Sequence, residues 1–173
     1  MDILSDREIF IRLIVITVIA SLIGIEREYM HKPAGLRTNV LVGLGSTLMT
    51  IASVKSVEIF PELRTVDPTR IAAQIITGIG FIGAGAILRP VGSGNQNVIG
   101  LTTAATLWVV CGMGIAVGMG FYFEAILTGL LVFFTFFALG KVVERVREFT
   151  KAFPPKPVLE DEDILRGASS EEK

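Results

Sequence analysis

IAAQIITGIGFIGAGAIL, residues 71–88, decides how the rest of this chain must be read. Its eighteen residues include no charged side chain, and Arg70 and Arg89 stand at its two ends. An uncharged, predominantly apolar run of this length is typical of a helix that crosses a membrane. The stretch therefore predicts a membrane protein.

The same stretch contains a formal G-x-G-x-x-G pattern at residues 78–83. A dinucleotide-binding loop of this pattern needs a strand before the glycines and an acidic residue about 20 positions after them. Apolar residues lie on both sides here, and no acidic residue follows at that distance. The glycines instead favour close packing of helices in lipid, so we do not expect a nucleotide site.

The composition agrees with a membrane protein. Hydrophobic residues make up 51% of the 173 residues and the mean hydropathy is +0.62, which exceeds what a soluble domain of this length carries. Cys111 is the only cysteine, so no intrachain disulfide is expected. The first residues lack a basic segment, which indicates that the first span is retained rather than cleaved as a signal peptide. No nucleophile–base pair is visible, and we do not expect an enzyme.

The hydropathy pattern predicts an all-α, polytopic membrane helix bundle. Five spans are expected at residues 9–25, 39–54, 71–88, 99–117 and 121–139. Ser5 and Glu8 form a capping pattern before the first span, and Asp67-Pro68 does so before the third. We predict that residues 1–152 form one membrane domain, with the fifth helix continuing beyond the apolar core. The acidic tail, residues 153–173, is predicted to be disordered.

Basic residues predict the orientation. One side of the membrane would hold nine of them: Arg27, Lys32, Arg37, Arg89, Lys141, Arg145, Arg147, Lys151 and Lys156. The other side would hold five: Arg7, Arg12, Lys55, Arg64 and Arg70. The positive-inside rule then predicts an N-terminus outside and a C-terminus in the cytoplasm.

Small residues predict the helix contacts. Gly114 and Gly118 form a G-x-x-x-G pair, and Gly80 and Gly83 lie in the third span. Plain helix contact is one interpretation, and a pore or gate that needs close backbone approach is the other. We predict a homodimer or larger oligomer that uses the Gly114–Gly118 face.

Polar residues fall into two groups, which we call the outer and the inner cluster. The outer cluster, at the start of the third span, consists of Asp67, Arg70 and Gln74. Asp67 is either a helix cap or a functional carboxylate. Arg12 and Glu124, at similar depth, either pair or leave Arg12 to extend to the interface.

The inner cluster joins residues from the ends of the first, second and fourth spans. It consists of Glu26, Arg27, Glu28, Arg37, Thr38, Asn39, Thr102 and Thr103. Their oxygens suit a hydrated divalent cation such as Mg²⁺, and an ordinary rim of charges and caps is the alternative. Glu26 and Asp67 are the candidate metal-binding carboxylates, and no resident cofactor is expected.

Three segments together resemble a known family. GIEREYMHKPAGLRTNVLVGLGS (24–46), DPTRIAAQIITGIGFIGAGAIL (67–88) and GLTTAATLWVVCGMGIAVGMGFY (100–122) closely resemble the MgtC/SapB family of bacterial inner-membrane proteins. The E-R-E, A-G-L-R-T, D-x-x-R and T-A-A-[ST]-x-W motifs of the family fall on residues 26–28, 34–38, 67–70 and 103–108.

The resemblance implies a role in Mg²⁺ homeostasis and growth at low Mg²⁺, and in pathogens persistence inside host cells. The protein would act as an ion transporter or as a regulator of ion balance. The alternative is a non-transporting protein that binds and modulates another membrane complex, such as the F-type ATP synthase. Two departures stand out. Val109 replaces a cysteine of some members, and the ACT-like C-terminal domain of many members is not expected here.

Overall fold

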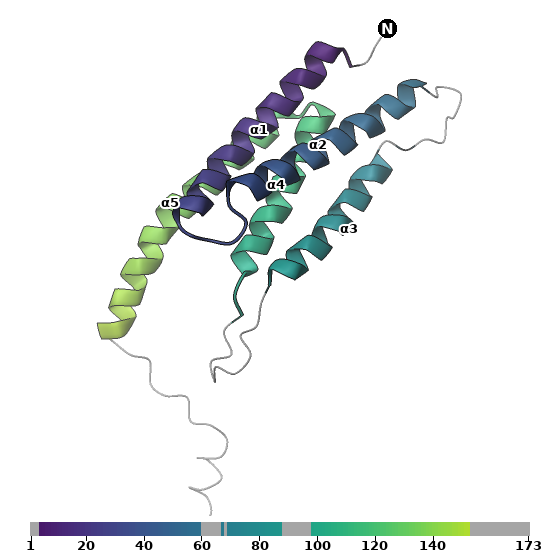
Figure 1. Cartoon of the computed structure of the whole chain (residues 1–173). Coiled ribbons are helices and arrows are strands. Elements are labelled where there is room, and N and C mark those ends of the chain that lie inside the picture. The colour runs from purple at the N-terminus through teal and green to yellow at the C-terminus, as the bar shows by residue number, and fades with distance from the viewer. Residues whose placement is uncertain (1–3, 60–66, 68, 88–97, 153–173) are drawn as a thin grey trace, which may run out of the picture. The chain divides into compact units, whose positions relative to one another are not determined.

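The computed structural model describes residues 4–59, 67, 69–87 and 98–152, which form five helices (Figure 1). The helices are α1 (Asp6–Tyr29), α2 (Leu36–Ile59), α3 (Thr69–Ala86), α4 (Leu101–Met119) and α5 (Tyr122–Ala152). No strand occurs in these residues. The predicted all-α class is confirmed, with one helix at each predicted span. Leu88 and the predicted disordered tail, residues 153–173, lie outside the described residues.

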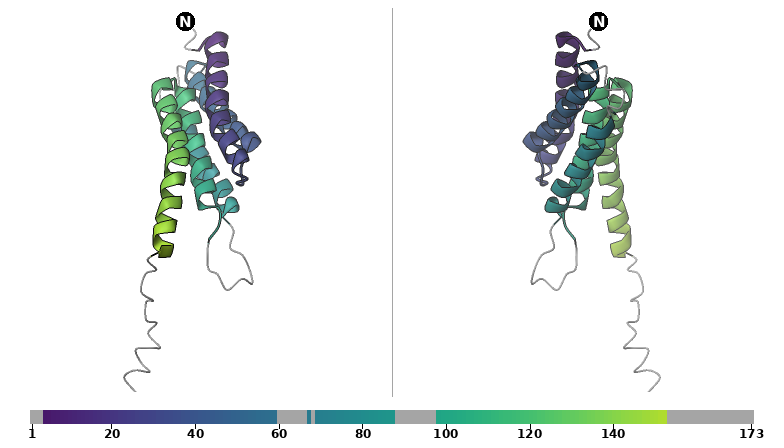
Figure 2. Two further views of the ribbon diagram at one scale, coloured as in Figure 1. Left: turned by 90° about the vertical axis from the view of Figure 1, so that its left-hand side faces the viewer. Right: turned by 90° about the vertical axis from the view of Figure 1, so that its right-hand side faces the viewer.

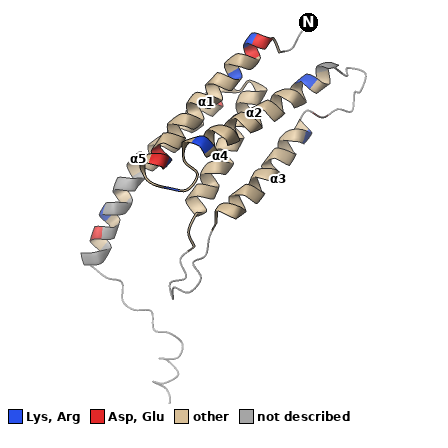
Figure 3. Cartoon of the chain, viewed as in Figure 1, with Lys and Arg blue, Asp and Glu red and all other residues tan. Residues whose placement is uncertain are grey.

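The helices have the lengths and compositions of a polytopic membrane bundle. α1, α4 and residues 36–57 of α2 are long and apolar enough to cross a membrane, and α5 begins with a shorter apolar segment, Tyr122–Ala138. α3 has 18 residues and carries Arg70 and Gln74 in its first two turns. Figure 3 shows charged residues near the helix ends and along the later part of α5, while the middle of each described span is uncharged.

The start of α1 shows how the local sequence sets a helix boundary. Ser5 Oγ accepts a hydrogen bond of 3.3 Å from the backbone N–H of Glu8, which confirms the predicted cap. The Glu8 carboxylate does not accept a hydrogen bond from the Ser5 backbone N–H. It accepts hydrogen bonds from the Arg12 guanidinium, at 3.4 Å, and from the Tyr122 hydroxyl.

Contacts divide the chain into residues 1–136 and residues 137–173. In the first unit α4 packs against α2 and α3, and α1 packs against α2. Figure 2 shows these helices from two sides. One apolar core joins α1, α4 and the start of α5, and includes Ile16, Ile23, Val110 and Ala125. A second core joins α3 and α4. In the second unit the structure describes residues 137–152, the later part of α5.

The second core fixes which face of α3 turns inward. Its members are Ala72 and Ile79 of α3 and Leu107, Cys111 and Ile115 of α4. Cys111 is therefore buried among apolar side chains, as the sequence indicated.

Two glycines of α4 allow α2 to approach closely. A Cβ atom on Gly114 would overlap the Ser46 side chain, and one on Gly118 would lie 2.5 Å from Thr50 Cβ. Only glycine leaves room for the partner helix at both places. The Gly114–Gly118 face is thus occupied by α2 of the same chain.

Candidate functional site

A row of buried polar side chains, which we call the polar seam, lies where α2 meets α4. None of them is more than 4% exposed: Asn39, Ser46, Thr47, Thr50 and Ser53 on α2, and Thr103 and Thr106 on α4. Thr47 Oγ1 donates across the interface to the carbonyl oxygen of Gly114, at 2.9 Å. Ser46, Thr50 and Thr106 each donate to a carbonyl one turn back on their own helix. These bonds let hydroxyl groups lie between apolar helices without a desolvation penalty.

Arg27 lies at one end of the seam and is 5% exposed. Its Nη2 donates to Thr103 Oγ1 at 3.2 Å, and its guanidinium carbon lies 5.2 Å from the ring centroid of Phe136. Its Nε is buried and donates to no acceptor among the described residues. The cation is held by a hydroxyl and an aromatic face, and one of its donors is left over.

Two buried oxygens of the inner cluster also lack a partner. Asn39 Nδ2 donates to the carbonyl oxygens of Ala34, at 2.6 Å, and Gly35, at 2.9 Å, while its Oδ1 accepts nothing. Glu26 Oε2 is likewise buried and unpaired. Within the described residues, these two oxygens and Arg27 Nε are the buried side-chain nitrogen and oxygen atoms that lack a partner. Such atoms are rare in folded proteins, and a water molecule or an ion is one kind of partner that satisfies them.

The remaining inner-cluster residues lie at the surface of the bundle. Glu28 Oε2 accepts from the backbone N–H of Leu36 at 3.1 Å, which ties the start of α2 to the end of α1. Arg37, Thr38 and Thr102 are exposed. The structure therefore buries Arg27, Asn39 and Thr103, leaves Glu26 half-buried, and exposes the other four residues.

The outer cluster is dispersed. Asp67 Oδ1 accepts from the backbone N–H of Thr69, at 2.8 Å, and from its hydroxyl, at 2.6 Å, as a capping residue does. These hydrogen bonds hold the pKa of the Asp67 carboxyl below its usual value. Arg70 and Gln74 are exposed on α3.

The two candidate metal-binding carboxylates lie far apart. Glu26 precedes Arg27, which contacts the first turn of α4. Gly83 of α3 lies beside Ala104, and α3 begins fourteen residues earlier, so Asp67 lies toward the opposite end of α4. One ion cannot contact both carboxylates. In the described residues, no three His, Cys, Asp or Glu side chains are placed to hold a metal ion.

The structure gives Arg12 partners other than Glu124. Its side chain is buried within the chain, with 7% exposure. Its Nη1 donates to the carbonyl oxygen of Gly118 at 2.6 Å, and its Nε lies 3.4 Å from Glu8 Oε1. The four-residue spacing of Glu8 and Arg12 could have predicted that pair. The Gly118 carbonyl depends on how α1 and α4 pack, which the sequence does not show.

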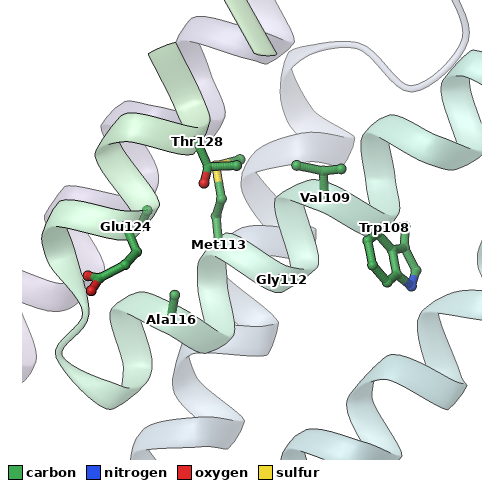
Figure 4. A pocket seen from close by; sticks show the side chains of 8 residues that line it. Trp108, Val109, Gly112, Met113, Ala116, Glu124 and Thr128 are labelled. Carbon is green, nitrogen blue, oxygen red and sulfur yellow. The ribbon is translucent and has the colours of Figure 1, made fainter. Parts of the chain in front are cut away.

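Glu124 instead lines a cleft of about 250 Å³ between α4 and the first half of α5 (Figure 4). Trp108, Gly112, Ala116 and Thr128 are among the residues that line it with Glu124. Glu124 is exposed there and has no hydrogen-bond or ion-pair partner in the described part of the chain. The candidate packing glycines of α3 differ from each other, because Gly83 contacts Ala104 while a Cβ on Gly80 would meet nothing within 4 Å.

Comparisons with known proteins agree with the motifs. The sequence profile of the MgtC family matches residues 13–145. The chain is 41% identical to Protein SapB of Bacillus subtilis over 143 residues, which is 82% of this chain and 60% of that protein. It is 49% identical over 117 residues to the protein named "Putative magnesium transporter YhiD" of Escherichia coli K12, covering 66% of this chain and 53% of that protein.

A third relative is Protein MgtC of Salmonella typhimurium LT2, which is 36% identical over 138 residues, 80% of this chain and 55% of that protein. The chain thus spans about half the length of the curated relatives that it matches, or slightly more. No solved structure matches it.

Proposed function

Since the chain belongs to the MgtC family, we propose that it serves Mg²⁺ homeostasis in a bacterial inner membrane and supports growth at low Mg²⁺. One relative is named "Putative magnesium transporter YhiD". One observation in this chain supports the proposal. Two buried oxygens of the inner cluster, Glu26 Oε2 and Asn39 Oδ1, have no hydrogen-bond partner among the described residues.

These oxygens suit a hydrated ion. Mg²⁺ loses its water shell reluctantly and is often held through its waters rather than by a full set of protein ligands. Water molecules on the ion would donate hydrogen bonds to the carboxylate and the amide oxygen. Arg27 carries a like charge, but Thr103 and the Phe136 ring hold its guanidinium.

A matched pair of variants tests the role of Glu26 within the inner cluster. Glu26→Gln removes the charge and keeps the size, and we expect it to abolish rescue of growth at low Mg²⁺ in a strain that lacks its own family member. Glu28→Gln is the control, because it makes the same change two residues away on an exposed side chain. Its amide oxygen can still accept from the Leu36 N–H. Both variants must insert in the membrane at the wild-type level. Wild-type rescue by Glu26→Gln would contradict the proposal.

A second measurement separates transport from regulation. The purified chain is reconstituted in liposomes that enclose a Mg²⁺-sensitive dye. Flux that Glu26→Gln abolishes and Glu28→Gln retains would make the protein a transporter. Rescue of growth without flux would make it a regulator of ion balance.

A further inference from the structure

The outer face of α3 is unusual for a helix in lipid. α3 packs on α4 through Ala72, Ile79 and Gly83, which are buried. Arg70, Gln74, Thr77 and Phe81 follow one another at spacings of four, three and four residues, so they share one face on the opposite side. All four are exposed, and Phe81 is 85% exposed.

One polar side chain on this face has no hydrogen-bond partner. Thr77 satisfies its own hydroxyl by donating to the carbonyl oxygen of Ala73 at 3.1 Å. Gln74 has no hydrogen-bond partner in the described residues, and a polar side chain that faces lipid is costly. The face therefore favours a partner that offers hydrogen-bonding groups to Gln74 and a second carboxylate to Arg70, whose charge already acts on the Asp67 carboxylate.

The cleft between α4 and α5 offers both. On its floor Gly112 and Ala116 form a small-x-x-x-small pair, and a Cβ on Gly112 would meet nothing within 4 Å. Small residues at this spacing allow another helix to approach closely. Glu124 and Thr128 line the α5 side, and the exposed Trp108 lies on α4 (Figure 4). The small side chains at the bottom of the cleft thus leave room for a helix, and the Glu124 carboxylate at its edge has no partner among the described residues.

The depths of the two surfaces match. Gly83 lies against Ala104, so Arg70, thirteen residues earlier on the antiparallel α3, is level with Val117. A Cβ on Gly129 would lie 3.7 Å from Met113 Sδ, so Glu124, five residues earlier on the antiparallel α5, lies near the level of Gly118. Arg70 and Glu124 therefore differ in depth by about one residue, or roughly 1.5 Å.

The same count applies one turn further along. Gln74 is level with Met113, and Thr128 is level with Gly114, again within one residue. Phe81 is level with Thr106, two residues from Trp108, which is about 3 Å in depth. Three residues on the α3 face thus correspond in order and in depth to three residues of the cleft.

We propose that the α3 face of one copy docks in the α4–α5 cleft of a second copy of this chain. Copies that share one orientation in a membrane are related by rotation about the membrane normal, and this rotation preserves depth. Arg70 of the neighbouring copy then reaches Glu124, its Gln74 amide reaches Thr128, and its Phe81 ring meets Trp108. The contact is heterologous, so a repeated contact closes into a ring when the rotation allows it.

This inference does not rest on the role in Mg²⁺ homeostasis. Charge complementarity selects a second copy as the partner, because one chain carries an exposed cation on the first surface and an exposed carboxylate on the other at the same depth. The proposed contact differs from the assembly surface that the sequence indicated, which was the Gly114–Gly118 face. That face is covered by α2 of the same chain.

Cross-linking tests the geometry. In a Cys111→Ala background, which leaves no native thiol, one preparation carries Gln74→Cys and another carries Thr128→Cys. When the two are mixed in lipid and oxidised, we expect a disulfide-linked dimer, while neither variant cross-links alone. Cross-linking of Gln74→Cys alone would show an α3–α3 contact and overturn the proposal. No cross-link in the mixture would overturn it as well.

Charge reversal tests the energetics. By native mass spectrometry in mild detergent, we expect Arg70→Glu to weaken association tenfold or more, because two carboxylates would then face each other. The double variant Arg70→Glu/Glu124→Arg should restore it. Arg145→Glu is the control, since it reverses an exposed charge on α5 outside the cleft. Arg70→Glu that associates like wild type, or a wild-type chain that is monomeric in both detergent and lipid, would refute the contact.

Discussion

Two buried arginines lie near opposite ends of α1 and have different surroundings. Arg12 donates to the Gly118 carbonyl and contacts Glu8, so its charge meets the carbonyl end of α4 and a carboxylate. Both partners favour a cation. Arg27 meets the Thr103 hydroxyl and the Phe136 ring near the start of α4, and one of its donors stays unpaired. We therefore assign Arg12 to stability and Arg27 to the candidate site.

At the residue scale, Arg12→Ala should destabilise the protein by about 2 kcal/mol, because it removes a charge-assisted hydrogen bond and leaves a buried carbonyl unpaired. Arg7→Ala is the control, since Arg7 is exposed on the same helix. Thermal unfolding in detergent measures both. Equal melting temperatures for the two variants would contradict the assignment.

Asp67 gives a residue-scale prediction about pH. Its hydrogen bonds to Thr69 lower its pKa from the usual 3.8, so their stabilisation is present above that value and is lost as the pH falls through the lowered pKa. Asp67→Asn should remove this pH dependence and keep rescue at low Mg²⁺, because asparagine caps about as well as aspartate. Circular dichroism across the acid range and the growth assay check the two statements. Loss of rescue would instead give the carboxylate an ionic role.

At the element scale, α4 is the helix around which the first unit is organised, and its glycines serve different partners. Gly114 and Gly118 face α2, whereas Gly112 faces the cleft. The capping bond at Ser5 and the turn at Gly120, with a φ of 93°, show that helix ends follow from local sequence. Which glycine faces which neighbour follows only from helix packing.

Two leucine substitutions on α4 should therefore behave differently. Gly114→Leu should destabilise the fold by at least about 2 kcal/mol, because the side chain overlaps Ser46 and α2 cannot approach. Gly112→Leu should leave the unfolding temperature of the monomer unchanged and prevent association, because it fills the floor of the cleft. Thermal unfolding and native mass spectrometry of both variants are the measurements. A stable Gly114→Leu variant would refute the close α2–α4 contact.

At the scale of the whole molecule, the arrangement of charge along the chain predicts its orientation. A count of nine basic residues on one side and five on the other predicts a cytoplasmic C-terminal end. A reporter fused after Lys173 should be active when it requires the cytoplasm and silent when it requires the periplasm. The opposite result would reverse the orientation and place the inner cluster on the outer side of the membrane.

The sequence by itself determined that the chain is a membrane protein, that it forms five helices, and that it belongs to its family. Hydropathy, capping residues and ordered motifs depend on residues that are close together in the sequence, so they can be recognised without a structure. It also singled out Glu26, Arg27 and Asn39, whose polar groups are costly to bury in lipid.

Only the tertiary structure decided the partners of these residues. In lipid both the packed and the exposed face of a helix are apolar, so periodicity does not tell which face turns inward. The partner of Arg12, the separation of Glu26 from Asp67, the occupation of the Gly114–Gly118 face by α2 and the cleft at Gly112 each depend on how the helices rotate and which become neighbours.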